Sequence, residues 1–208
     1  MRAVSSVIGR AVPIDRPDID TDQIVPAVWM KKIERVGFAD GLFQKWRRDP
    51  AFVLNQPERR GATILIAGAN FGCGSSREHA VWALRDYGFG AIIAPSFADI
   101  HRNNLPSSGL VPVVAAAAVV DTLMAATTAD ATTEIVIDVV RRVVSCEQAG
   151  VQEAQFFLDD AAHHRLVNGL DLIDMTLQLD ARISDHELRR PDWLPSCDGV
   201  VHTSSTVG

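Results

Sequence analysis

The sequence predicts an α/β protein whose central, mainly parallel sheet is flanked by helices, with further helices toward the C-terminus. Three short apolar runs rich in β-branched residues, at 62–68, 91–94 and 110–115, are separated by two helical patterns. Strands that alternate with helices usually pair in parallel through crossover connections. Strand patterns on either side of this region, at 4–14 and 134–146, predict an additional β layer.

The N-terminal quarter of the chain is less regular than the middle. Residues 4–14 predict a short strand that ends in a turn at Pro13, and residues 18–26 form an acidic segment closed by Pro26. Residues 29–55 mix aromatic, basic and helix-forming residues with little periodicity. Such a mixture favours short helical pieces joined by exposed loops.

The first buried strand and the helix after it are the clearest elements. Residues 62–68 are apolar and bounded by glycines, which is typical of a buried strand. A helix is expected over about 76–87, because Ala80 and Leu84 recur at helical spacing and Gly88 suits its C-terminal end.

Later segments continue the alternation. Residues 96–104 predict a helix that begins with a capping pattern formed by Ser96 and Asp99. Residues 119–126 predict another helix, and 159–188 predict two more.

Length and composition limit the possible functions. The chain of 208 residues is expected to form one domain over 1–195, followed by a small, polar tail at 196–208 that we expect to be disordered. A net charge of −6 argues against a nucleic-acid or anionic-membrane partner. The longest apolar run, 109–120, is too short to cross a bilayer. The N-terminus shows no secretory signal, so we expect a cytoplasmic protein.

The cysteines argue against a metal cluster on this chain. Cys73, Cys146 and Cys197 are widely spaced and include no Cys-x-x-Cys pair. This pattern fits free thiols in a reducing compartment. Iron–sulfur clusters need several thiolates. We therefore expect no metal ligands and no cofactor here, and any cluster must sit on another polypeptide.

The glycine-rich loop after the first buried strand predicts a carboxylate-binding site. Gly72 and Gly74 allow a sharp turn, and the helix that follows points unpaired N–H groups beyond the sheet edge. A helix N-terminus favours anions, and Arg77 adds a planar fork that suits a carboxylate. Ligands of α/β proteins usually bind at this edge of the sheet.

Structural roles for the same residues remain open at this point. Ser75 and Glu78 match a capping box, so Ser75 can be a helix cap, and Ser76 can supply either the cap or the chemistry. His79 can be a structural histidine, and Cys73 can be only a small residue in a tight turn.

Spacing excludes three other glycine-rich sites. A P-loop requires a lysine that the loop lacks, and a nucleophile elbow requires a glycine two residues after its serine, where Arg77 stands. A dinucleotide fingerprint would require a third glycine in place of Glu78.

Three segments in order along the chain resemble motifs of the aconitase-superfamily swivelling domain, as in small subunits of 3-isopropylmalate dehydratase. They are residues 18–26, 70–80 and 94–104. Residues 41–47 and 52–55 look like the bacterial leucine-pathway branch of that family. The resemblance covers about residues 1–195 and implies a swivelling β/β/α domain.

The resemblance also implies a reaction. The family is a group of hydro-lyases that interconvert 2-isopropylmalate and 3-isopropylmalate through 2-isopropylmaleate in leucine biosynthesis. A separate large subunit carries a [4Fe–4S] cluster, and the small subunit closes over it in a heterodimer or heterotetramer. This chain would therefore act on a small dicarboxylate only together with that subunit.

Roles carry over by position within the matched motifs. Ser75 matches the general base, and Arg77 matches the anchor of the substrate carboxylate. Ser76 lies beside them as a substrate-binding residue, and Asp22 matches an acidic residue with an orienting role. Asp22 can also be only a turn aspartate. The loop and helix start are completed by five residues: Gly72, Cys73, Gly74, Glu78 and His79.

Substrate choice is expected in residues 29–32, which align with the family's loop for the variable substrate group. Trp29 and Met30 can form an apolar wall for an isopropyl group, whereas Lys31 and Lys32 can favour a third carboxylate. Homoaconitase or methylmalate-type activity is therefore an alternative, as is a free-standing carboxylate-binding module. The basic residues can also be only an exposed helix start, and residues 29–36 are expected to be poorly ordered without the partner.

Overall fold

The structure is a computed structural model that describes residues 2–190. It divides into two compact units, Met1–Asp171 and a second unit that begins at Leu172. The expected tail at 196–208 and Cys197 lie outside the described residues, so the expectations about them are not tested.

The first unit is built on a closed barrel whose strand order is β1-β2-β3-β4-β7-β6-β5. The strands are β1 (Ser6–Ile14), β2 (Ile64–Ala67), β3 (Ala91–Ala94), β4 (Val111–Ala115), β5 (Glu134–Asp138), β6 (Val143–Cys146) and β7 (Val151–Phe157). The strands β1 to β4 pair in parallel, as the alternation with helices predicts. The remaining neighbours pair antiparallel, so the sheet is a mixed barrel rather than a mainly parallel layer.

The barrel closes because the first strand pairs with a different partner in each half. Residues Ser6 to Arg10 pair with β5, and Ala11 to Ile14 pair with β2. Pro13 lies opposite Ile66 inside this pairing, so the predicted turn at Pro13 is wrong. Short connections join β5, β6 and β7, and short connections can join only antiparallel strands.

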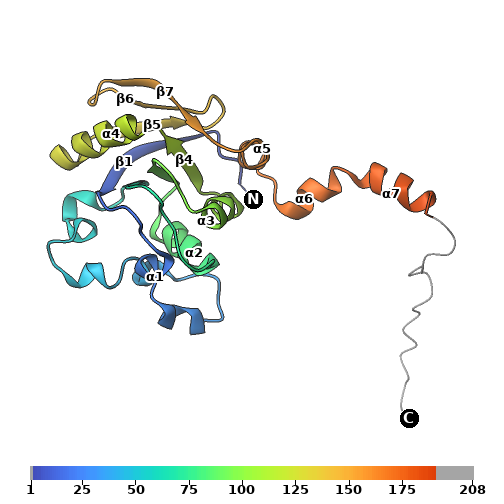
Figure 1. The fold of residues 1–208 in the computed structure, drawn as a ribbon, viewed down its shortest axis with the longest axis horizontal. Coiled ribbons are helices and arrows are strands. Elements are labelled where there is room, and N and C mark those ends of the chain that lie inside the picture. The colour runs from blue at the N-terminus through green and yellow to red at the C-terminus, as the bar shows by residue number, and fades with distance from the viewer. Residues whose placement is uncertain (1, 191–208) are drawn as a thin grey trace, which may run out of the picture. The chain divides into compact units, whose positions relative to one another are not determined.

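Both faces of the central strands are buried, which explains their continuous apolar sequences. In β2, Leu65 and Ala67 belong to one core cluster, whereas Ile64 and Ile66 belong to a second. The first cluster includes the buried face of α2 (Glu78–Tyr87), and the second includes that of α4 (Ala117–Ala129). Figure 1 shows α1 (Thr21–Ile24), α2 and α3 (Asp99–Asn104) on one side of the strands, and α4 on another.

The segment between β1 and β2 differs partly from the sequence prediction. It forms short 3₁₀ turns, as the expected helical pieces suggested. They are Ala27–Lys31, Ala39–Gly41, Trp46–Arg48, Val53–Asn55 and Pro57–Arg59. The expected exposed loops are wrong in part, because Phe38, Leu42 and Phe43 are fully buried. These side chains belong to the same buried cluster as residues of β1 and α2, so this part of the segment belongs to the core.

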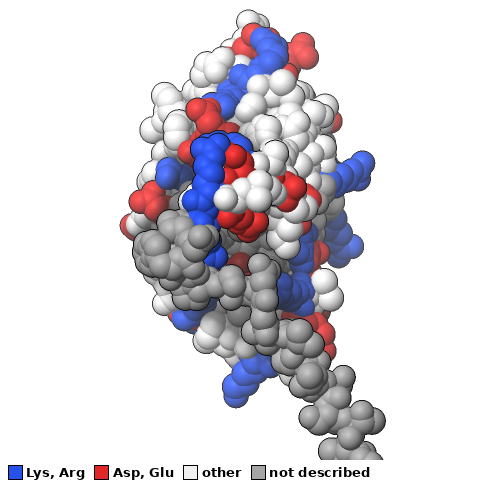
Figure 2. All heavy atoms as spheres, turned by 90° about the vertical axis from the view of Figure 1, so that its right-hand side faces the viewer, with Lys and Arg blue, Asp and Glu red and all other residues white. Residues whose placement is uncertain are grey.

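Residues 159–188 contain three helices where two were predicted. They are α5 (Asp160–Asn168), α6 (Leu172–Leu177) and α7 (Asp180–Leu188). The strand β7 was not predicted, because only Phe156 of its seven side chains is buried and its sequence lacks a clean alternation. Within the described residues, no helix is long and apolar enough to span a membrane. On the face drawn in Figure 2, acidic and basic side chains lie interspersed.

Candidate active site

The loop at residues 69–73 continues the parallel pairing past the carboxyl end of β2. On one side, the Gly72 N–H donates to the Ile19 carbonyl at 2.8 Å, and the Thr21 N–H donates to the Cys73 carbonyl at 3.0 Å. Main-chain hydrogen bonds thus fix the loop against the segment that follows β1. The site lies where ligands of α/β folds usually bind.

The other side of the loop pairs with the segment that follows β3. The Phe71 N–H donates to the Ser96 carbonyl at 3.1 Å, and the Ala98 N–H donates to the Phe71 carbonyl at 3.0 Å. The Ser96 hydroxyl accepts from the Asn70 N–H at 2.8 Å. Ser96 therefore supports the loop and does not cap α3, whose N-cap is Ala98, so the predicted capping pattern is wrong.

Gly72 is required by both its backbone angle and its surroundings. Its φ is +76°, a conformation that side chains with a Cβ rarely adopt. A Cβ at this position would lie 2.2 Å from the Cδ2 atom of His101. The ring of His101 therefore packs directly on Gly72 and supports the turn.

The helix after the loop begins at Glu78, two residues later than predicted. Its N-cap is Arg77, and no side chain caps it, so the predicted capping box of Ser75 and Glu78 does not form. Instead, the Ser75 carbonyl accepts a hydrogen bond from the Thr21 hydroxyl at 2.9 Å. Ser75 and Ser76 are exposed. This arrangement leaves the Ser75 hydroxyl without a capping role.

Arg77 forms an ion pair with Asp22, which the sequence placed in the same site. Asp22 stands on α1, whose own capping box joins Asp20 and Gln23 through hydrogen bonds of 2.7 and 3.0 Å. The Arg77 side chain is 16% exposed, whereas that of Asp22 is 47% exposed. Such a half-exposed pair contributes little to stability but fixes the direction of the guanidinium.

A cleft of about 280 Å³ is lined by two of the catalytic candidates, Ser75 and Arg77, but not by Asp22. The loop and helix start form one wall, and the start of α3 forms the other. Its lining consists of Gly72, Gly74, Ser75, Ser76, Arg77, Ala98, Asp99, Ile100 and His101. Two serine hydroxyls and a guanidinium in one open cleft can bind a small carboxylate and act on its carbon skeleton.

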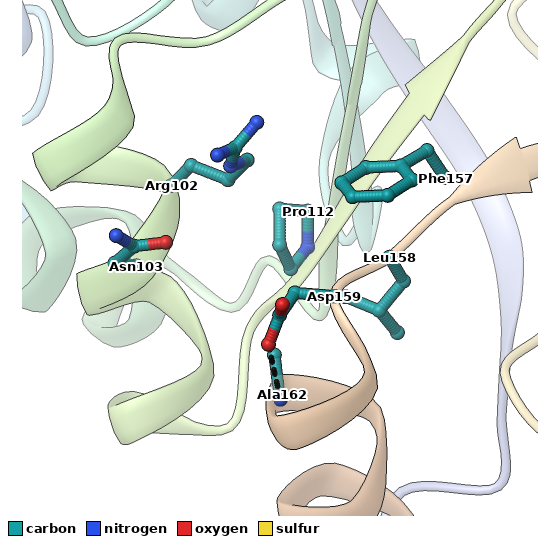
Figure 3. Close-up of a pocket in the computed structure, with 7 residues that line it drawn as sticks. All are labelled: Arg102, Asn103, Pro112, Phe157, Leu158, Asp159 and Ala162. Carbon is teal, nitrogen blue, oxygen red and sulfur yellow. Dashed lines mark hydrogen bonds between the residues drawn. The ribbon is translucent and has the colours of Figure 1, made fainter.

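A second pocket can be set aside as a substrate site. It lies between α3, β4 and the start of α5, where Arg102 and Phe157 extend over Pro112 (Figure 3). Its volume is about 10 Å³, which is room for roughly one water molecule. Two of its lining residues are joined by a hydrogen bond of 3.1 Å, which the Ala162 N–H donates to the Asp159 carboxylate (Figure 3).

His101 is a cleft residue that the sequence reasoning missed. It is 4% exposed, and its Nε2 atom has no hydrogen-bond partner among the described residues. Burial lowers the pKa of His101 to about 4, so the ring is neutral near pH 7. Its ring also meets that of Phe71 edge-on at 5.5 Å. His101 lies within the matched segment 94–104, but no local sequence signal indicates its burial or its contact with the loop.

Cys73 is a half-buried thiol in the turn. Burial, followed by the nearby carboxylates of Asp20 and Asp18, raises the pKa of the Cys73 thiol. A thiol that stays protonated is neither a nucleophile nor a good metal ligand. Within residues 2–190, no group of three or more histidine, cysteine or acidic side chains could hold a metal ion.

His79 and Glu78 lie at the start of α2 but do not line the cleft. The ring of His79 packs against Trp82 at 4.9 Å and against Phe38 at 5.5 Å. This packing favours the structural reading of His79. Glu78 is an exposed acidic residue in the first turn, where it suits the helix dipole.

Residues 29–32 are split between an inner and an outer face. The Trp29 ring covers Gly41, and its Nε1–H donates to Gln44 at 3.1 Å. The Lys32 ammonium donates to the Gly37 carbonyl at 3.1 Å. Met30 and Lys31 are exposed. The segment does not line the cleft, and its expected disorder without a partner stays a prediction.

Comparisons with known proteins show which family the chain resembles. Residues 1–118 match the family model described as the aconitase C-terminal domain. A 3-isopropylmalate dehydratase small subunit from a Parafrankia species is 54% identical, over 94% of this chain and 99% of the relative. One from Streptomyces griseus is 52% identical, over 94% and 98%. A crystal structure of 3-isopropylmalate dehydratase (leuD) from Methanocaldococcus jannaschii superimposes with a TM-score of 0.63 at 25% identity, covering 87% of this chain and 99% of that one.

Proposed function

Because the chain belongs to the family of 3-isopropylmalate dehydratase small subunits, within the aconitase superfamily, we propose that its cleft is one half of that enzyme's active site. The chain is a hydro-lyase subunit of leucine biosynthesis. One observation carries the proposal: Ser75, Ser76 and Arg77 open into a single cleft at the start of a helix. We place this chemistry in the cytoplasm.

Arg77 binds a substrate carboxylate in this proposal. Its guanidinium presents paired N–H donors, and the free N–H groups at the start of α2 favour the same negative charge. Asp22 holds the guanidinium by an ion pair before substrate arrives. The incoming carboxylate then binds the Arg77 guanidinium alongside Asp22. Asp22 keeps the guanidinium in the correct orientation.

Ser75 removes the proton from the substrate carbon. A serine hydroxyl is too weak an acid to ionise at neutral pH, so its alkoxide must be stabilised by the site. The start of α2 and the neighbouring Arg77 supply positive potential for this. Among residues 2–190 the Ser75 hydroxyl has no hydrogen-bond partner, which leaves it available to the substrate. Ser76 binds the substrate beside it.

The family's [4Fe–4S] cluster does not fit residues 2–190 of this chain. Cys146 is buried in the barrel core, Cys73 lies in the loop after β2, and the described residues offer no group of metal ligands. We therefore assign the cluster to a large subunit, in a heterodimer or heterotetramer. The contribution of this chain is limited to binding, orientation and proton transfer.

Although it does not line the cleft of this chain, the 29–32 segment selects the variable group of the substrate in this proposal. Met30 is an exposed apolar side chain, whereas the Lys32 ammonium is engaged by Gly37 and lies 5.3 Å from the Phe38 ring centre. Only Lys31 of the two lysines then remains for a third carboxylate. An exposed Met30 and a lysine that is already engaged favour an isopropyl group over the carboxylate of a homoaconitase substrate.

Reconstitution tests the proposed function. The chain is mixed with its large subunit under anaerobic conditions, and kcat/KM is measured for 3-isopropylmalate, homoaconitate and 3-methylmalate. The mixture should be active, each subunit alone inactive, and 3-isopropylmalate the best substrate. A higher kcat/KM for another acid would overturn the specificity assignment. An inactive mixture, with tight carboxylate binding by the isolated chain, would indicate a binding module instead.

A further inference from the structure

Helix α2 contacts two functional regions. Its N-cap, Arg77, faces the cleft, while a separate set of side chains on the helix holds the 29–38 segment. His79, Trp82 and Asp86 follow one another at helical spacings of three and four, so they share a face. Most of the contacts described below join that face, or the adjacent Arg85, to the segment, and one lies within the segment.

Aromatic rings form the first part of this attachment. The ring of Phe38 packs against His79 at 5.5 Å and against Trp82 at 5.6 Å. Trp29 in turn packs against Phe38 at 6.1 Å. Since Phe38 is fully buried, these contacts fix the segment from within the core.

Polar contacts form the second part. The Phe38 N–H donates to the Asp86 carboxylate at 3.0 Å, and the Arg85 guanidinium donates to the Arg35 carbonyl at 2.8 Å. Burial alone would raise the pKa of Asp86, but the hydrogen bond from Phe38 and the adjacent Arg85 lower it. The carboxylate therefore accepts as a charged group, which makes its hydrogen bonds stronger than neutral ones.

Several of the side chains between these attachment points are exposed. Ile33 is 94% exposed and Met30 is 40% exposed, whereas Phe38 and Trp29 turn inward. The Arg35 guanidinium lies 5.7 Å from the ring centre of Trp82, so Arg35 contacts α2. Trp82 and Asp86 thus hold the base of a segment whose outer side chains are free to meet a ligand.

We propose that Trp82 and Asp86 are positioning residues for substrate choice, because they fix the 29–38 segment to the helix that presents Arg77. Neither residue lines the cleft. A helix is a rigid spacer with a rise of about 1.5 Å per residue, so α2 sets the distance from the carboxylate anchor to the outer side chains of the segment. The proposal rests on the assignment of substrate choice to residues 29–32.

Loosening this attachment should weaken discrimination without removing catalysis. A pocket wall typically distinguishes one methylene by about 10- to 200-fold, provided that it is held in place. If the wall moves, binding of the larger isopropyl group suffers most. The smaller 3-methylmalate depends less on the wall, so its kcat should change little.

The test uses the reconstituted two-subunit enzyme with Trp82→Ala and Asp86→Asn. The ratio of kcat/KM for 3-isopropylmalate to that for 3-methylmalate should fall at least fivefold in Trp82→Ala and about twofold in Asp86→Asn, by analogy with the loss of one wall contact. Trp82→Phe, which retains a ring, should restore the ratio to within about twofold of wild type. An unchanged ratio in both Trp82→Ala and Asp86→Asn would overturn the proposal.

Trp46→Ala is the matched control. Trp46 is also a half-buried tryptophan on the same core, but it packs against Phe43 and Phe52 rather than α2. Trp46→Ala should lower the free energy of unfolding and leave the ratio of the two kcat/KM values unchanged. An equal change of the ratio in Trp46→Ala would mean that general destabilisation is responsible, and would contradict the proposal.

A readout without turnover separates this proposal from the proposed function. In the isolated chain, Trp82→Ala should speed tryptic cleavage at Lys31, Lys32 and Arg35 at least fivefold, since local opening governs cleavage. Trp46→Ala should not. If the segment opens but the substrate ratio stays unchanged, the attachment is real and its role in substrate choice is wrong. If wild type itself fails to turn over isopropylmalate, the proposed function has failed instead.

Discussion

The catalytic loop and the 29–38 segment lie near the same helix but are held in different ways. The loop is fixed by main-chain hydrogen bonds to the segments after β1 and β3, including Gly72 to Ile19 and Phe71 to Ser96. The 29–38 segment is fixed to α2 mainly through side chains, namely those of Trp82, Arg85 and Asp86.

This difference separates reaction from specificity. Main-chain pairing does not depend on side-chain identity, so residues 70–73 keep their pairing when most neighbouring side chains vary. Ser75 and Arg77 follow directly, and one side chain each, Thr21 and Asp22, contacts them. Side-chain attachment can be altered by single substitutions. With the roles we propose, substrate choice can therefore change while the loop before the proton-transfer site stays in place.

The largest effect is expected where the catalytic loop itself is broken. Gly72→Ala forces a Cβ against His101 and strains a φ of +76°. We expect a loss of about 3 kcal/mol or more in the free energy of unfolding, and loss of activity. Gly150→Ala is the matched control, because its φ is +66° but no atom lies within 4 Å of the added Cβ. It should cost only about 1 kcal/mol in urea unfolding. Equal losses would contradict the packing argument.

A smaller effect is expected when the carboxylate anchor changes but the loop stays intact. Arg77→Lys keeps the charge and loses the planar fork, so kcat/KM should fall about 100-fold, or about 2.7 kcal/mol of transition-state stabilisation. The free energy of unfolding should change by less than about 1 kcal/mol, because the pair with Asp22 is partly exposed. Steady-state kinetics and urea unfolding measure both, and a kcat/KM within threefold of wild type would contradict the assignment.

The support beneath the loop should be sensitive to pH. The pKa of His101 is lowered to about 4 in the fold, so the unfolded chain takes up a proton first as pH falls from 6.5. Stability is therefore lost as the pH falls from about 6.5 to about 4. Between pH 7 and pH 5, His101 should account for a decrease of about 2 kcal/mol in the free energy of unfolding. His101→Phe should remove that part of the slope in urea unfolding. A slope identical to wild type would disprove the assignment.

The smallest effect is expected on the outer face of the 29–38 segment. Met30→Ala removes an exposed apolar side chain, so KM for 3-isopropylmalate should rise about fivefold, or roughly 1 kcal/mol, with kcat unchanged. Lys31→Ala should leave KM for 3-isopropylmalate within about twofold of the wild-type value. A large fall in kcat for Met30→Ala would break the separation between reaction and specificity.

Local patterns predicted the central elements well. β2, β3 and the end of α2 at Gly88 lie where apolar runs and helix-ending residues indicated. Barrel closure was missed because it depends on the two halves of β1 pairing with strands far apart in the sequence. No window of local sequence contains that information.

The roles of the predicted site residues stay predictions, but the structure shows how these residues lie. Asp22 on α1 pairs with Arg77, the N-cap of α2, and Ser75 lies two residues before Arg77 in the same cleft. The sequence suggested Ser75 as a cap, but the Thr21 hydroxyl engages the Ser75 carbonyl and the helix begins later. The capping box of Asp20 and Gln23 was visible in the sequence as an Asp-x-x-Gln pattern and could have been found. His101 could not, because its role comes from tertiary packing.

The central claim is that Ser75 carries the proton transfer from a loop fixed by the main chain. The most direct measurement is kcat of the reconstituted enzyme at saturating 3-isopropylmalate for Ser75→Ala, beside Ser76→Ala. Ser75 is exposed, so its substitution should leave the free energy of unfolding unchanged. We expect kcat to fall by about 100-fold or more for Ser75→Ala, the usual contribution of a general base, and by clearly less for Ser76→Ala. A loss below about tenfold for Ser75→Ala would contradict the account.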